Sequence, residues 1–193
     1  MNKIIPTPSK IEVDKYLQEW NNLENYVNQE NSLRKLFKET YCLNNDINEV
    51  LIKVCSLNDF YSTNIFNVFE VAKHILKLKI DERLKEGDTN LVNDIAKMKI
   101  SGKEKNFYSF ATKYCSHHNP NEYPIYDSYV EKVLMHFKKK DKFAIFQKAD
   151  LKNYTNYKQV LIQFKKFYNI NEYNLKELDR YLWLLGKEYF PKY

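Results

Sequence analysis

Apolar residues recur along this chain at helical spacing, and no segment alternates apolar and polar positions at a period of two. Val50, Leu51, Val54 and Leu57 form one such stripe, and residues spaced in this way share one face of a helix. The pattern therefore predicts an all-α fold with many helices. Further helices are predicted over residues 10–29, 31–41, 90–98, 106–116, 128–140, 155–168 and 174–189. Another helix, with capping residues at 62–64, is predicted to carry Val68, Val71, Ala72, Ile75 and Leu78.

The length and composition agree with a single all-α domain. The chain has 193 residues, of which 44% are hydrophobic and 16% are aromatic, and this is enough to build a sizeable core. It contains only three Gly and five Pro, which favours long helices over a β-sandwich with many tight turns. Short connections are predicted at residues 86–89 and 99–103.

Charge and cysteine content narrow the expected partners and compartment. The net charge of +6 comes from 31 Lys+Arg against 25 Asp+Glu and favours a polyanionic partner, although an AT-rich genome would also enrich Lys, Asn, Ile and Tyr. Cys42, Cys55 and Cys115 are too few and too scattered for a disulfide framework or a C-x-x-C metal knuckle. We expect a cytoplasmic monomer with no secretory leader and no membrane span.

One acidic residue stands where an apolar segment meets a new helix. Residues 123–126 precede Asp127, and apolar residues follow it at helical spacing. A carboxylate in that setting can meet a charged reaction centre. The same position also suits a helix cap, because an Asp oxygen accepts an orphan backbone N–H. Ser128 and Glu131 add an S-x-x-E pattern that predicts a capping box.

Two short motifs, in this order, connect predicted helices. Ile100-Ser101-Gly102-Lys103 lies between the helices at 90–98 and 106–116, and the string IYDSYV at residues 125–130 opens the next one. This order resembles the helix-hairpin-helix DNA glycosylase superfamily, which includes endonuclease III, adenine glycosylase and 8-oxoguanine glycosylase. In that family a Gly-containing hairpin is followed by a loop that delivers a catalytic Asp at a helix start.

The resemblance implies a fold and a reaction. The fold is a multi-helix, DNA-glycosylase-like domain with a degenerate helix-hairpin-helix, in which residues 47–140 form the core and residues 1–46 and 141–193 add helices that pack on it. The implied reaction is hydrolysis of the N-glycosidic bond of a damaged or modified base flipped out of DNA. Asp127 would stabilise the oxocarbenium ion or activate water.

The resemblance also assigns binding roles, each with an ordinary structural alternative. Substrate-binding roles fall on Asn58, Tyr61, Ser128 and Trp183, and DNA-binding roles on Gly102, Lys103 and Lys105. Asn58 also suits a helix cap, and the two aromatic residues also suit the core. A glycine turn flanked by solvated lysines would explain the hairpin residues as well.

The chain departs from the family in four places. Glu104 stands where the family usually has a second hairpin Gly, and Tyr129 replaces the His of the catalytic string. Asn106 aligns with the Lys of the lyase members, so a monofunctional glycosylase is expected. The four-Cys iron–sulfur loop of some members is missing, because three scattered cysteines cannot supply it.

Neither a metal nor another cofactor is expected. His117 and His118 are adjacent, without a carboxylate or a Cys pair at ligand spacing. The leading hypothesis is thus a DNA glycosylase, acting in repair or against DNA with unusual bases. The alternatives are a catalytically inactive DNA-binding module of the same fold and an all-α protein-interaction domain.

Overall fold

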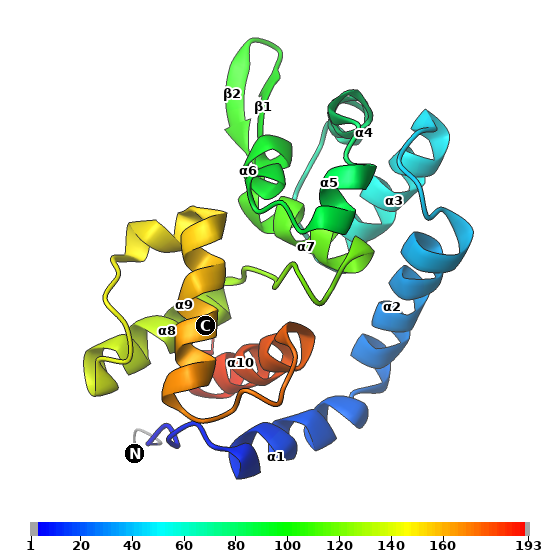
Figure 1. Ribbon diagram of the computed structural model, residues 1–193. Helices are drawn as coiled ribbons and strands as arrows, with labels where there is room; N and C mark the ends of the chain where they lie inside the picture. The colour runs from blue at the N-terminus through cyan, green and yellow to red at the C-terminus, as the bar shows by residue number, and fades with distance from the viewer. Residues whose placement is uncertain (1–3, 192–193) are drawn as a thin grey trace. The chain divides into compact units, whose positions relative to one another are not determined.

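The computed structural model describes residues 4–191 and is mostly helical (Figure 1). The chain divides into two compact units. Within the described residues, unit 1 comprises residues 4–27 and 126–191, and unit 2 comprises residues 28–125. The predicted core, 47–140, therefore draws on both units. All-α character is confirmed, apart from one small two-stranded sheet.

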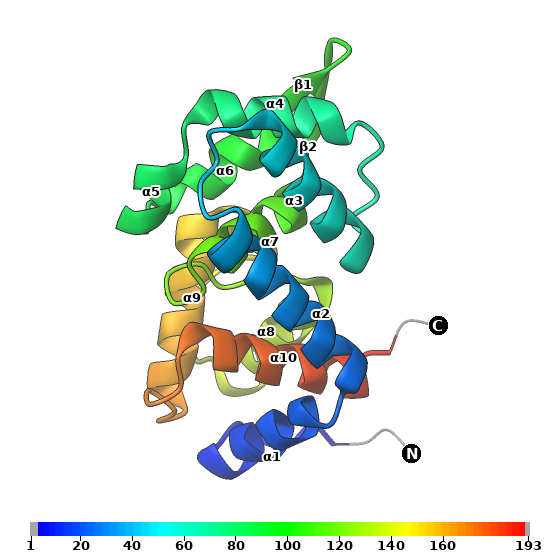
Figure 2. The same ribbon diagram turned by 90° about the vertical axis from the view of Figure 1, so that its right-hand side faces the viewer.

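Unit 1 is built around α10 (Leu175–Tyr189), which packs against both α1 (Lys10–Asn21) and α8 (Ser128–Asp141) (Figure 2). The remaining elements of this unit are the first residues of α2 (Glu24–Lys35), the 3-10 helix η2 (Lys148–Lys152) and α9 (Tyr154–Phe167). Its core is aromatic and aliphatic, and Phe137 of α8 meets Phe164 of α9 edge-on. Fully buried aliphatic residues of this core include Val13, Val133, Leu134, Leu178, Leu182 and Leu185.

Unit 2 holds the rest of α2 and a series of short elements. In chain order they are the π-helix η1 (Leu36–Thr40), α3 (Ile47–Phe60), α4 (Val68–Leu78), α5 (Asp81–Glu86), α6 (Asn90–Ala96), β1 (Lys97–Ile100), β2 (Lys103–Asn106) and α7 (Tyr108–His118). Helix α3 packs against α4 and α7, and α6 packs against α7.

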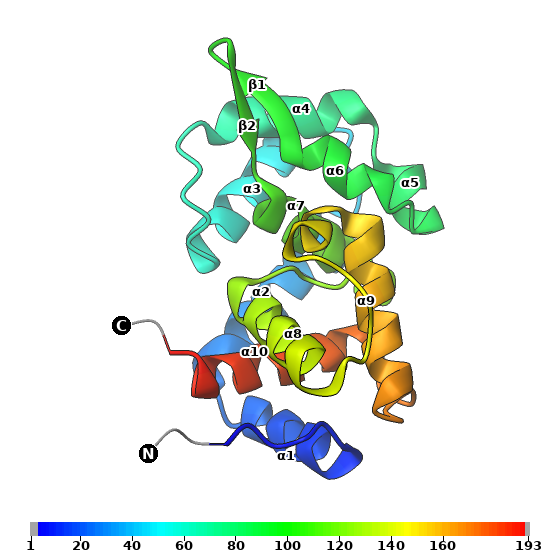
Figure 3. The same ribbon diagram turned by 90° about the vertical axis from the view of Figure 1, so that its left-hand side faces the viewer.

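The segment predicted as a tight connection between two helices is instead a β-hairpin (Figure 3). Lys97 pairs with Asn106 and Ile100 with Lys103 in an antiparallel ladder. Ser101 and Gly102 form the two-residue turn, with φ of 50° and 76°. Paired positive φ values characterise the turns whose twist matches that of hairpin strands. The helix predicted over 90–98 therefore ends at Ala96.

A polar network in unit 2 ties the loop before α3 to α5 and α7. The Oδ1 atom of Asn44 accepts hydrogen bonds from Lys53 Nζ at 2.7 Å and from Tyr114 OH at 2.6 Å, and lies 3.2 Å from His118 Nε2. Asp81 accepts two hydrogen bonds from Asn44. Burial lowers the pKa of the Lys53 ammonium to about 8. These buried groups are paired, so the network fixes the loop geometry.

This network predicts a loss of stability in mild acid. Burial, reinforced by the charges of Lys53 and Lys38, lowers the pKa of His118 well below its usual value. The unfolded chain protonates this histidine near pH 6.5 while the folded chain does not, so stability falls as pH drops below that value. We expect His118→Gln, which keeps a donor for Asn44, to make this fall shallower by about 1.4 kcal/mol per pH unit.

Urea unfolding at pH 7, 6 and 5 measures this slope. Burial also lowers the pKa of His136, so the variant should retain part of the dependence. An unchanged slope in His118→Gln would show that this imidazole is not the group responsible.

Candidate functional site

Asp127 is the N-cap of α8 and sits in extended backbone, with φ of −138° and ψ of 155°. Its Oδ1 atom accepts a hydrogen bond from the Tyr129 N–H at 2.8 Å, and the residue is half-buried. Among residues 4–191, its Oδ2 atom has no hydrogen bond or ion pair. One carboxylate oxygen is therefore fixed while the other is available.

The neighbouring acid in this helix is already neutralised. Glu131 lies one turn beyond Asp127, accepts a hydrogen bond from the Tyr126 hydroxyl and pairs with Lys148 at 2.9 Å. Lys152 donates to the same tyrosine hydroxyl. Burial would raise the pKa of Glu131, but hydrogen bonds from Tyr126 and Lys148 outweigh it and lower the pKa. The predicted capping box is thus absent, since Glu131 serves these partners and Asp127 caps the helix.

A close helix contact positions the start of α8. A Cβ atom built on Gly186 of α10 would lie 2.7 Å from Tyr129 Cβ and 2.8 Å from the Tyr129 carbonyl oxygen. Only glycine fits this position without moving the backbone that follows Asp127. Gly186 therefore helps to set where the Asp127 carboxylate lies. Ser128, the first residue of α8, directly follows Asp127 and is half-buried.

Trp183, the remaining predicted substrate-binding residue of unit 1, is half-buried on α10. Its ring lies 6.4 Å from that of Tyr129 and 5.1 Å from that of Tyr26, both edge-on. Trp20 of α1 completes the group, 6.0 Å from Trp183. The structure thus brings Trp183 near the N-terminus of α8, which carries Asp127.

The predicted pocket residues of unit 2 have internal partners. The Asn58 side chain bonds both the N–H and the C=O of Ile65 and accepts from Thr63, so it organises the loop before α4. The Tyr61 hydroxyl lies 3.0 Å from His117 Nε2. Asn58 lies within α3 and bonds to the loop before α4, so it does not act as a helix cap.

The predicted DNA-binding residues lie on the hairpin. Gly102 occupies its turn, and nothing lies within 4 Å of a Cβ built there. Lys103 and Lys105 belong to β2 and are exposed. A strand follows the glycine, and α7 begins only at Tyr108. The lysines are accessible to a polyanion, but the backbone here is not a helix N-terminus.

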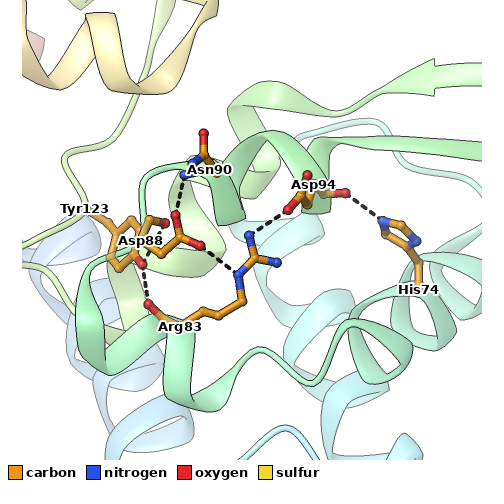
Figure 4. Close-up of polar contacts among 6 residues, drawn as sticks. All are labelled: His74, Arg83, Asp88, Asn90, Asp94 and Tyr123. Carbon is orange, nitrogen blue, oxygen red and sulfur yellow. Dashed lines mark hydrogen bonds and ion pairs between the residues drawn. The ribbon is translucent and has the colours of Figure 1, made fainter.

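Tyr123, in the segment that leads toward Asp127, is anchored within unit 2 (Figure 4). The Tyr123 hydroxyl lies within hydrogen-bond distance of the carbonyl oxygens of Arg83 and Asp88, at 2.9 and 3.1 Å. Arg83 in turn bonds Asp88 and Asp94 at 2.8 and 2.6 Å. The two carbonyl partners of the Tyr123 hydroxyl explain why this residue is fully buried in spite of its polar group.

Other features of the described residues bear on function. A cavity of about 460 Å³ lies in unit 2 against Phe37, Asp81 and His118, and no residue predicted for the site lines it. Across residues 4–191, no group of three or more His, Cys, Asp or Glu side chains is placed to hold a metal ion. None of the helices in this range is long and apolar enough to cross a membrane.

Sequence comparison assigns the chain to a family. The model of the HI_0787_N family, described as an N-terminal domain, matches residues 12–122. This is 111 of the 193 residues, so the chain belongs to that family. A protein of Haemophilus influenzae (strain ATCC 51907 / DSM 11121 / KW20 / Rd), named only as an uncharacterized protein, is 60% identical over 147 residues, which cover 76% of this chain and 70% of the relative. No solved structure matches the chain.

Proposed function

We propose that this protein is a DNA glycosylase that hydrolyses the N-glycosidic bond of a damaged or modified base, with Asp127 as the catalytic carboxylate. The observation that carries the proposal is the geometry of that side chain. One oxygen is held by the backbone of α8, and the other has no hydrogen bond or ion pair within the described chain. A fixed anion with an available oxygen is suited to a reaction that develops positive charge.

The reaction breaks the bond between C1′ of the sugar and the base nitrogen, and positive charge builds on the sugar as the base leaves. The Asp127 carboxylate stabilises that charge, or accepts a hydrogen bond from the attacking water and orients it. The water oxygen bonds to C1′, one of its protons remains on the new hydroxyl, and the other neutralises the departing base. Helix α8 directs the positive end of its dipole at the carboxylate.

The finer fold assignment is part of the same proposal. The β1–β2 hairpin lies between α6 and α7. DNA glycosylases of the helix-hairpin-helix superfamily have their hairpin at the corresponding place. The hairpin of this chain would present Lys103 and Lys105 to the DNA backbone. Asn106 offers no amine, so base release proceeds without a Schiff base. The protein would act as a cytoplasmic monomer, with no cofactor.

Base release from defined oligonucleotides tests the proposal. The protein is incubated with duplex and single-stranded DNA carrying normal, oxidised, alkylated, deaminated and bulky modified bases, and free base is measured by mass spectrometry. We expect release from one class of modified base and none from normal DNA. A protein that releases no base from any of these substrates is not the proposed enzyme.

The exposed lysine hairpin favours a second candidate, a non-catalytic DNA-binding module. Lys97, Lys99, Lys103 and Lys105 are all exposed on its two strands, and a basic β-ribbon can follow a nucleic-acid groove. This candidate predicts DNA affinity that falls steeply with salt, together with no base release.

A further inference from the structure

A group of aromatic and cationic side chains in unit 1 forms what we call the aromatic–cation surface. Its rings come from α1, the start of α2, the first turn of α8 and α10, and its cations from α8 and α10. Its members are Trp20, Tyr26, Tyr129, Lys132, Arg180, Trp183 and Lys187. The sequence singled out only Trp183 among them.

The rings touch one another but remain partly accessible. The Trp183 ring lies at the centre, with the Tyr26, Trp20 and Tyr129 rings 5.1, 6.0 and 6.4 Å away. All four residues are half-buried. The chain has two tryptophans, and both belong to this surface. Partly exposed rings held by edge-on packing are rigid and offer faces for stacking.

Two of the cations over these rings, Lys132 and Lys187, form no ion pair with an acid among residues 4–191. Lys187 Nζ lies 4.7 Å from the Tyr26 ring centre and 4.8 Å from that of Trp183, and donates to the Tyr26 hydroxyl at 2.8 Å. Lys132 Nζ lies 5.8 Å from the Tyr129 ring centre. In the described part of the chain neither lysine forms an ion pair with a carboxylate. Their positive charge therefore remains available to a polyanion.

We propose that the aromatic–cation surface binds single-stranded nucleic acid. Unpaired bases stack on the exposed parts of the Trp20 and Trp183 rings, and the Lys187 and Lys132 ammonium groups contact the phosphates between them. Aromatic side chains interleaved with cations are the chemistry by which proteins hold unpaired strands without reading sequence. In a duplex the base faces are stacked inside, so a duplex can bind this surface only through electrostatic contacts with its phosphates. This binding goes beyond the proposed hydrolysis and does not need Asp127.

Tryptophan fluorescence reports on this surface directly, because the chain has no tryptophan elsewhere. The full chain is titrated with a thymidine homopolymer, a uridine homopolymer, a DNA duplex and heparin, a polyanion that has no bases. We expect both homopolymers to quench the emission, and the duplex and heparin to quench it less at equal occupancy. Equal quenching by heparin, or no quenching by either single strand, would overturn the proposal.

Variants separate stacking from charge. By fluorescence anisotropy of a labelled thymidine homopolymer, Trp183→Leu should weaken binding by about 5- to 150-fold, and Trp183→Phe should restore most of it. Lys187→Met should weaken binding and flatten its salt dependence, while Lys139→Met, at an exposed position of α8, should do neither. Equal effects of the two lysine variants, or wild-type affinity in Trp183→Leu, would refute the assignment.

The homopolymer titration of Asp127→Asn keeps this proposal distinct from the catalytic one. Because the aromatic–cation surface does not include Asp127, we expect the homopolymer to quench the fluorescence of this variant as it does in the wild type. Loss of base release together with retained quenching supports both proposals, whereas quenching by a wild-type protein that releases no base supports only this one.

Discussion

Asp127→Asn is expected to lower base release by about 10²–10³-fold, the cost of removing one group that stabilises charge in a transition state. Asparagine is as good an N-cap as aspartate, so it can still accept the Tyr129 N–H and leave α8 intact. What it removes is the negative charge of the carboxylate, whose Oδ2 atom has no hydrogen bond or ion pair among residues 4–191. Single-turnover base release, measured on the substrate identified above, gives the ratio, and DNA binding should be unchanged or tighter.

Asp46→Asn is the matched control for this substitution. Asp46 caps α3 through bonds to the Asn48 and Glu49 N–H groups, so both variants exchange one capping residue for another. The control should change the unfolding free energy by less than about 1 kcal/mol and leave base release at the wild-type rate. If Asp127→Asn were equally harmless to base release, Asp127 would be a helix cap and nothing more.

Gly186→Val is expected to lower the free energy of unfolding by about 2–3 kcal/mol, since it places atoms where the backbone of Tyr129 already lies. Gly186→Ala should cost less, because alanine regains about 1 kcal/mol of helix propensity. Chemical unfolding followed by circular dichroism gives both values. Base release should fall as well, because relief of the overlap shifts the first turn of α8 and with it Asp127.

Lys139→Val provides the comparison, since it introduces the same side chain at an exposed position of α8. Its cost should be within about 0.7 kcal/mol, the difference in helix propensity alone. A Gly186→Val protein as stable as this control would mean that α8 and α10 separate freely, and that Gly186 does not set the position of Asp127.

Local signals in the sequence were sufficient to locate most helices. Asn174 begins α10 through a capping box with Glu177, and Asp127 begins α8, because a short polar side chain followed by an apolar stripe specifies both a start and a buried face. The helix predicted over 10–29 is divided near Asn22, which ends α1. Interruptions between consecutive helices depend on tertiary packing and leave only a weak signal in the local sequence.

Features with very short local patterns, and features formed by residues distant in sequence, could not be predicted. The hairpin was missed because buried and exposed residues alternate over only four positions in β1, and all of β2 is exposed. Four positions are too few to establish a period of two. Lys187 and Tyr26 meet across 161 positions, and no local pattern in either helix indicates the other. The pairing of Glu131 with Tyr126 and Lys148 likewise competes with its capping role through contacts that sequence spacing does not reveal.

The order of the units along the chain has a consequence for biosynthesis. The chain leaves unit 1 after Val27 and returns to it at Tyr126, so unit 2 is an insertion within unit 1. During translation all of unit 2 is synthesised while α1 still lacks α10, the helix that covers it. Domains tend to fold as units in the order of synthesis, so unit 2 can mature first. The apolar face of α1, with Val13 and Tyr16, must then stay soluble until α10 leaves the ribosome.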